Sequence, residues 1–186
     1  MPFLGGSMVE QFNPIQFVPG FYHQCPFKLH IEFDEMYKQV DQMIQQMFYD
    51  QDELIVVVNT YPMNPDRTVN PRFIKRFLKN SKLKYQLTTN AGQFEFDGER
   101  FPIVQFQLKC KMNDLYLKKL LYACCHVDML DYPRFKKKDA HFPPEVYVYN
   151  VTKGVVVHIY DDRGCELMFQ HDKEQNRRYP QFRLVL

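Results

Sequence analysis

Apolar and polar residues alternate with period two along three stretches of the chain, Phe27–Phe33, Leu83–Leu87 and Phe101–Cys110. Alternation of this kind predicts strands with one buried side and one solvent-facing side. A fourth stretch, Leu54–Val58, is apolar without interruption and mostly β-branched. Such a run is typical of a central strand that is covered on both faces. The pattern therefore predicts a sheet in which Leu54–Val58 is an inner strand.

Other regions carry apolar residues at helical spacing, which predicts amphipathic helices. The first helix is expected to be capped by Asp34, and its apolar face comprises Met36, Val40, Met43, Ile44, Met47 and Phe48. The second is expected to be capped by Asn113 or Asp114, and its face comprises Leu117, Leu120, Leu121 and Cys124. A short helix is expected at Pro71, because proline suits a first helical turn; it carries Phe73, Ile74, Phe77 and Leu78.

The C-terminal part of the chain predicts two consecutive hairpins. Glu145–Val151 and Val155–Tyr160 lie on either side of Thr152–Gly154, a three-residue turn with glycine where a positive φ is needed. The second of these strands runs into Asp161–Gly164 and then into the apolar stretch Cys165–Phe169. Two carboxylates, a guanidinium and a glycine between apolar runs are typical of a tight turn between two strands.

The order of these elements predicts a single α+β domain, residues 27–186, with a mostly antiparallel sheet and two or three helices packed on it. Residues 1–26 hold four of the twelve prolines and are expected to form an extended arm that packs on this body. Thr88–Gly98 is polar and rich in turn residues. His171–Tyr179 is polar and is expected to form one helical segment, which Pro180 ends.

Composition adds a large aromatic content to this picture. The 186 residues include 17 Phe and 12 Tyr but no Trp, and 45% of the chain is hydrophobic, so a sizeable core is expected. The formal charge is +2, which gives no strong signal for nucleic-acid binding. The densest basic stretches are Arg134–Lys138 and a group formed by Lys79, Lys82 and Lys84, which we interpret as solvated loops.

The five cysteines form an odd number without regular spacing, and they indicate free thiols in a reducing cytoplasm. Met1–Gly6 lacks the features of a signal peptide, and no stretch is apolar for long enough to span a membrane. Cys124, Cys125 and His126, with Asp128, Cys110 and His141, resemble metal ligands in composition only. The paired spacing of a structural zinc site is missing, so no metal and no other cofactor is expected.

Taken in order, these pieces resemble an uncharacterised bacterial family, the domain of unknown function 3885, over most of residues 21–186. The resemblance is strongest at Glu145–Asn150 and His158–Gly164, and it also includes Phe21-Tyr22, Ile31-Glu32-Phe33, Met47-Phe48 and the stretch from Asp50 to Asn59. The chain departs from the family pattern at His30, Asp34 and Glu166, where an arginine, a glycine and an aspartate are expected. The resemblance implies a bacterial cytosolic domain and no assigned activity.

The charged turn is the first candidate for a site. His158, Tyr160, Asp161, Asp162, Arg163, Gly164 and Glu166 could contact a partner, or they could simply shape a hairpin corner. In a metal-assisted hydrolase, Asp161, Asp162 and Glu166 would hold a divalent cation and Arg163 would stabilise an anion. A nucleophile hypothesis would pair Cys165 with His158 and Asp162. The structural interpretation is favoured, because a corner needs these residues without any substrate.

Tyr147 and Tyr149 lie on one face of their predicted strand, opposite Val146 and Val148. If this face is uncovered, it would be a protein-binding patch; the alternative, which is favoured, is a second buried layer under the N-terminal arm.

Two functions of different kinds therefore remain. The favoured hypothesis is a non-enzymatic cytosolic module that binds another protein, and one version of it is an immunity protein that neutralises a bacterial toxin. The alternative is the metal-assisted hydrolase that uses Asp161, Asp162 and Glu166.

Overall fold

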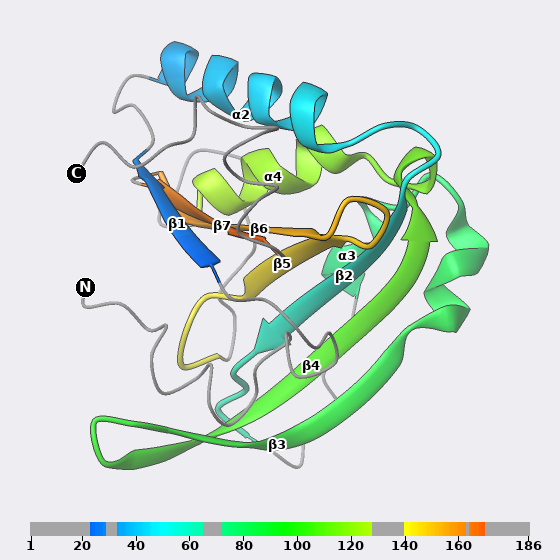
Figure 1. Ribbon diagram of the computed structural model, residues 1–186. Coiled ribbons are helices and arrows are strands. Elements are labelled where there is room, and N and C mark those ends of the chain that lie inside the picture. The colour runs from blue at the N-terminus through cyan, green and yellow to red at the C-terminus, as the bar shows by residue number, and fades with distance from the viewer. Residues whose placement is uncertain (1–22, 29–32, 65–71, 128–139, 163, 170–186) are drawn as a thin grey trace.

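The computed structural model describes residues 23–28, 33–64, 72–127, 140–162 and 164–169. Within them, strands form one antiparallel sheet in the order β1-β7-β6-β5-β2-β4-β3 (Figure 1). The strands are β1 (His23–Lys28), β2 (Glu53–Thr60), β3 (Thr88–Phe96), β4 (Glu99–Lys111), β5 (Glu145–Asn150), β6 (Val155–Asp161) and β7 (Gly164–Phe169).

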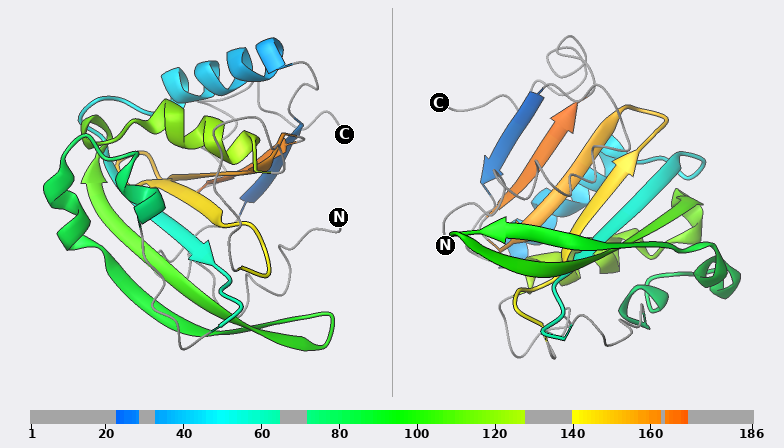
Figure 2. Two further views of the ribbon diagram at one scale, coloured as in Figure 1. Left: turned by 180° about the vertical axis from the view of Figure 1, so that it is seen from behind. Right: turned by 90° about the horizontal axis from the view of Figure 1, so that it is seen from below.

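The two longest helices, α2 (Phe33–Met47) and α4 (Leu117–Cys125), lie on the same face of this sheet, as both views in Figure 2 show. The short elements are α3 (Arg72–Lys75) and the 3₁₀ helices η2 (Ser81–Gln86) and η3 (Met112–Asp114).

The predicted class, an α+β fold with a mostly antiparallel sheet and helices packed on it, is thus confirmed. The predicted arm lies mainly outside the described residues, and the predicted C-terminal helical segment lies wholly outside them. None of the helices in the described ranges is long and apolar enough to cross a membrane.

The predicted inner strand is confirmed as β2, which pairs with β4 on one side and with β5 on the other. Its side chains alternate between the two faces of the sheet. Val56 and Val58 belong to the core under the helices, whereas Val57 belongs to a second buried cluster on the opposite face. The uninterrupted apolar run exists because both faces of this strand exclude water.

The core under the helices is built from the apolar faces that the helical spacing predicts. Its helical members include Met36, Val40, Met43 and Met47 from α2, and Leu117, Leu120, Leu121 and Cys124 from α4. Each fully buried side chain of this size contributes about 1.5–3 kcal/mol of transfer free energy. Polar contacts join the two helices: the Tyr37 hydroxyl lies 2.6 Å from His126 Nε2, and Lys118 Nζ donates to Asp41 over 2.6 Å.

The polar stretch Thr88–Gly98, which we expected to be turn-rich, contains strand β3 and its hairpin connection to β4. Asp97 and Gly98 both have positive φ, +52° and +78°, as the two central residues of a type I′ turn require. An Asp-Gly pair between alternating residues is a strong hairpin signal that outweighs the polar composition. That composition fits an edge strand, because most β3 side chains face water.

Gly98→Ala is expected to destabilise the chain by about 1 kcal/mol, because an L side chain is strained at this φ. A Cβ at Gly98 would meet no atom within 4 Å, so the loss of stability would come from backbone strain and not from a steric clash. Gly98→Asn should cost less, since asparagine tolerates the left-handed region. Urea denaturation of both variants measures the difference; equal stability of wild type and Gly98→Ala would contradict the turn assignment.

Other predicted boundaries need correction. Leu83–Leu87, predicted as a strand, lies mostly in the 3₁₀ helix η2, because the Asn80 side chain accepts a hydrogen bond from Lys82 N and caps it. Strand β1 begins at His23 rather than Phe27, because its partner β7 extends that far; Phe33 already belongs to α2. Helix α4 begins after Tyr116, because Asp114 instead accepts from Lys111 N within η3.

The two predicted C-terminal hairpins are confirmed. Strands β5 and β6 flank a turn in which Gly154 has a φ of +64°, and the turn also includes Val151. Strands β6 and β7 pair next, with Asp161 opposite Gly164 and an irregularity between Ile159 and Asp161. The charged corner therefore does reverse the backbone, as the structural interpretation requires.

Candidate functional site

The carboxylates of the charged corner are divided between different surroundings. His158 and Glu166 are paired across β6 and β7, and His158 Nδ1 lies 3.6 Å from a Glu166 carboxylate oxygen. Asp161 and Asp162 instead lie close enough to Cys125, at the end of α4, to help raise its pKa. Arg163 lies outside the described residues. Within the described ranges, no group of three or more His, Cys, Asp and Glu side chains is arranged to hold a metal ion.

The buried face of the sheet opposite the helices carries a polar cluster around His158. The imidazole stacks on Tyr147 with ring centroids 4.1 Å apart, and neither of its nitrogens has a hydrogen-bond partner among the residues that the structure describes. Glu166 stands beside it, and both side chains are less than 10% exposed. When His158 is protonated, the two form a buried ion pair, which leaves little net stabilisation after desolvation. Neither group faces solvent.

A chain of hydrogen bonds continues this cluster toward β4. The Tyr61 hydroxyl donates to Glu145, Asn59 Nδ2 donates to the same carboxylate oxygen over 3.3 Å, and Gln105 Nε2 donates to Asn59 Oδ1 over 3.0 Å. Burial is the main cause that raises the pKa of Glu145 from its ordinary value of 4.5, although the nearby His158 opposes this shift. Burial also raises the pKa of Tyr61 and of Tyr147.

The described cysteines are buried or half-buried thiols. Burial raises the pKa of Cys110 and of Cys125 to about 12, and it raises the pKa of Cys165 as well. A thiol is nucleophilic as the thiolate, so these cysteines are poorly suited to attack a substrate. Cys165 belongs to the core under the helices, whereas His158 lies on the other face, so the geometry does not support their pairing.

The other residues that resemble zinc ligands in composition are not gathered around a metal site either, as far as the structure describes them. His126 contacts Tyr37, and His141 packs edge-on against Phe101 with ring centroids 5.2 Å apart. Asp128 lies outside the described residues.

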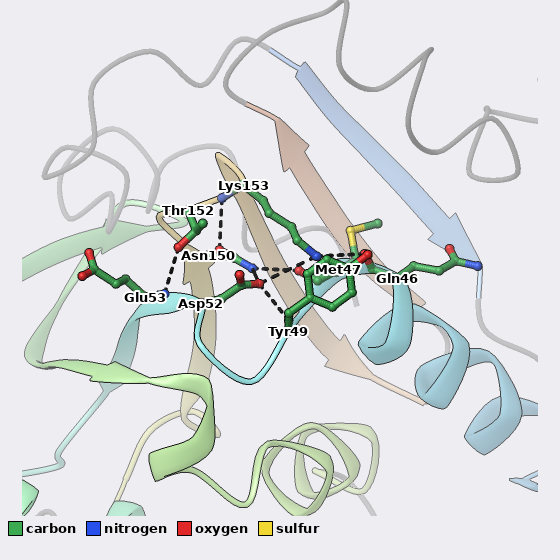
Figure 3. A network of polar contacts seen from close by, with 8 residues as sticks. All are labelled: Gln46, Met47, Tyr49, Asp52, Glu53, Asn150, Thr152 and Lys153. Atoms are coloured by element: carbon green, nitrogen blue, oxygen red, sulfur yellow. Dashed lines mark hydrogen bonds and ion pairs between the residues drawn. The ribbon is translucent and has the colours of Figure 1, made fainter.

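A second polar network joins the end of α2, the start of β2 and the β5–β6 hairpin (Figure 3). Asn150 is fully buried; its Nδ2 donates to Asp52 Oδ2 over 2.6 Å and to the Met47 carbonyl over 2.8 Å, and its Oδ1 accepts from Lys153 N over 3.1 Å. Lys153 Nζ donates to the carbonyl of Gln46 over 3.1 Å. The last turn of α2 has no basic residue of its own, so Lys153 supplies the favourable charge at this helix end.

Tyr147 and Tyr149 are 6% and 7% exposed, and Met168 and Val156 belong to the same cluster. This agrees with the predicted second buried layer; its predicted cover, the N-terminal arm, falls mainly outside the described residues. His158, Asp161, Gly164 and Glu166 are buried too, so these motif residues offer little surface to a partner.

Large aromatic side chains are exposed elsewhere, next to lysines. Tyr85 is 80% exposed and Tyr116 is 41% exposed. Lys84 Nζ lies 4.7 Å from the centre of the Tyr85 ring, and Lys119 Nζ lies 4.5 Å from that of Tyr116. We call the surface formed by Lys79, Lys82, Lys84, Tyr85, Tyr116 and Lys119 the lysine–tyrosine surface. It can offer ammonium groups and phenol rings together to a bound partner.

The sequence contains signals for the polar cluster around His158 and the hydrogen bonds that continue it. Asn59 and Gln105 are polar residues at inward positions of strands, and buried positions of this kind need hydrogen-bond partners. His158 interrupts a run of β-branched residues in the same way. The lysine–tyrosine surface is harder to find, because its members come from two separate segments of the chain.

Comparison with known proteins agrees with the resemblance seen in the motifs. A family model described as a domain of unknown function (DUF3885) matches residues 10–185. The chain is 26% identical to the uncharacterized protein YnaE of Bacillus subtilis (strain 168) over 195 residues, which covers 92% of this chain and 91% of YnaE. No solved structure matches the chain.

Proposed function

The chain belongs to the DUF3885 family, whose description gives no activity, and we propose that it is a non-enzymatic cytosolic module that binds another protein. The observation that carries this proposal is the exposure of Tyr85 and Tyr116, whereas rings such as those of Tyr61, Phe106 and Phe169 are buried. Tyrosine is enriched at protein interfaces, because it combines a rigid apolar ring with a polar end.

The buried groups support binding rather than chemistry. The Glu166 carboxylate and the His158 imidazole are withdrawn from solvent, and they face each other across two paired strands of the sheet. The described cysteines Cys110, Cys124, Cys125 and Cys165 are free thiols, which suits a reducing cytoplasm.

One version of this function is an immunity protein, which would bind and neutralise a bacterial toxin. In that version, co-expression of the chain with a toxin encoded by a neighbouring gene should restore growth.

Affinity capture with the whole chain tests the proposal in its general form. We expect a cytosolic protein to be retained from a bacterial lysate and, after purification of that protein, a stoichiometric complex with a Kd near or below about 1 μM. An unrelated domain of similar size and charge serves as the control bait. If repeated capture retains no protein that forms such a complex, the binding function is refuted.

A further inference from the structure

We infer that the lysine–tyrosine surface docks an acidic segment of the protein partner, an inference that rests on the proposed binding function. Its first support is that the structure joins two distant segments into one surface. Tyr116 N donates to the Phe77 carbonyl and Lys79 N to the Asp114 carbonyl, each over 2.8 Å, and Leu78 pairs with Leu115. These bonds hold the backbone around Lys79 against the backbone around Tyr116.

The extent of the surface follows from the local geometry. Lys79 Nζ lies 5.7 Å from the centre of the Tyr116 ring, so lysines of both segments flank this tyrosine. Tyr85 follows Lys79 by six residues, most of them in the 3₁₀ helix η2. At about 2 Å of rise per residue, the two positions are separated by roughly 12 Å along the helix axis. A single extended peptide of a few residues can span that length.

Charge is the second support. The sequence from residue 72 to residue 94 contains no aspartate or glutamate, although it contains six basic residues: Arg72, Lys75, Arg76, Lys79, Lys82 and Lys84. The nearby acid Asp114 is engaged, because its carboxylate accepts a hydrogen bond from Lys111 N over 3.0 Å. The surface therefore carries a local excess of positive charge even though the whole chain is close to neutral.

Third, these lysines differ from three exposed cations elsewhere on the protein. Lys38 pairs with Glu35, Arg100 with Glu95 and Lys118 with Asp41. By contrast, Lys79, Lys82, Lys84 and Lys119 form no ion pair within the described part of the chain. Such ammonium groups repel one another at short range, and an acidic ligand relieves this repulsion.

The same features favour an acidic peptide over a nucleic acid. Single-stranded nucleic acids stack their bases on open aromatic faces, but an ammonium already lies over the rings of Tyr85 and Tyr116. Binding to a phosphate backbone also usually comes with a marked basic excess, and the net charge here is +2. Carboxylates can contact the ammonium groups and the tyrosine hydroxyls without displacing either.

The test uses fluorescence anisotropy of the whole chain with a labelled poly-glutamate peptide. The probes for comparison are a poly-glutamine peptide and a single-stranded DNA oligonucleotide of the same length. We expect salt-sensitive binding of poly-glutamate and at least a roughly tenfold loss of affinity in Lys79→Glu/Lys82→Glu. The matched control, Lys38→Glu/Arg100→Glu, makes the same change in net charge at two other side chains, which are 65% and 75% exposed. This control should alter the affinity less than about twofold. Thermal unfolding verifies that both variants are folded.

Each other result overturns the inference. It fails if the wild type does not bind poly-glutamate, if both variants lose affinity equally, or if poly-glutamine binds as tightly. Tighter binding of the DNA assigns the surface to nucleic acids instead. If a captured partner binds Lys79→Glu/Lys82→Glu as it binds the wild type, the docking surface is wrong while the binding function stands. Only the failure to capture any such partner removes the proposed function itself.

Discussion

Asn150→Leu is expected to lower the free energy of unfolding by about 3 kcal/mol, one of the two largest effects that we predict for a single side chain. Asn150 is fully buried and its amide connects Asp52, the Met47 carbonyl and Lys153 N. Leucine has a similar size, so the loss comes from polar groups rather than from a cavity. A lost hydrogen bond to a charged group costs about 1.5–3 kcal/mol, and an unsatisfied buried carbonyl costs a further 1–3 kcal/mol.

Urea denaturation of the wild type and of Asn150→Leu measures this effect. The matched control is Asn113→Leu, which changes an exposed asparagine and should alter stability by less than about 0.5 kcal/mol. A loss in Asn150→Leu no greater than in the control would show that the network in Figure 3 does not hold the end of α2 against the β5–β6 hairpin.

Tyr61→Phe is expected to cost about 2 kcal/mol at neutral pH. The Tyr61 side chain is fully buried, and its hydroxyl donates to the Glu145 carboxylate. Removal of the hydroxyl keeps the ring packed against Phe142, whose centroid lies 5.6 Å away, but it takes a donor from a charged acceptor. In the Glu145→Gln background the cost should be smaller, because the acceptor is then neutral.

The pH dependence of Glu145→Gln tests the same site independently. Burial raises the pKa of Glu145 above 4.5, so the folded chain holds this proton more tightly than the unfolded chain does. The protonated Glu145 carboxyl contributes to the free energy of unfolding. This contribution is complete below about pH 4.5 and is lost as the pH rises through the raised pKa of the folded chain. Glu145→Gln removes this loss, so the variant should gain stability relative to the wild type as the pH increases.

Denaturation curves for the wild type, both single variants and the double variant at several values of pH complete the cycle. A difference between the wild type and Glu145→Gln that stays constant with pH would mean that the Glu145 carboxyl titrates alike in the folded and unfolded chains. Additive effects of Tyr61→Phe and Glu145→Gln would show that the two side chains are not coupled.

The candidate site was less predictable than the fold. The sequence led us to the charged turn at Asp161 because a charged motif is visible as a string of residues. The structure assigns that turn to a hairpin and buries Asp161. The lysine–tyrosine surface has no such string, because Lys79 and Lys119 approach the same ring from segments forty residues apart in sequence.

By itself, the sequence determined the elements that depend on local chemistry. The helical spacing of apolar residues predicted the buried faces of α2 and α4, and a β-branched run predicted the inner strand β2. Gly154 predicted a turn that needs a positive φ. Only the tertiary structure decided that polar Thr88–Phe96 forms an edge strand, that Tyr61 donates a hydrogen bond to Glu145, and that lysines gather around Tyr116. The reason is physical: periodicity records which side chains share a face, whereas the neighbour that covers that face comes from a distant part of the chain.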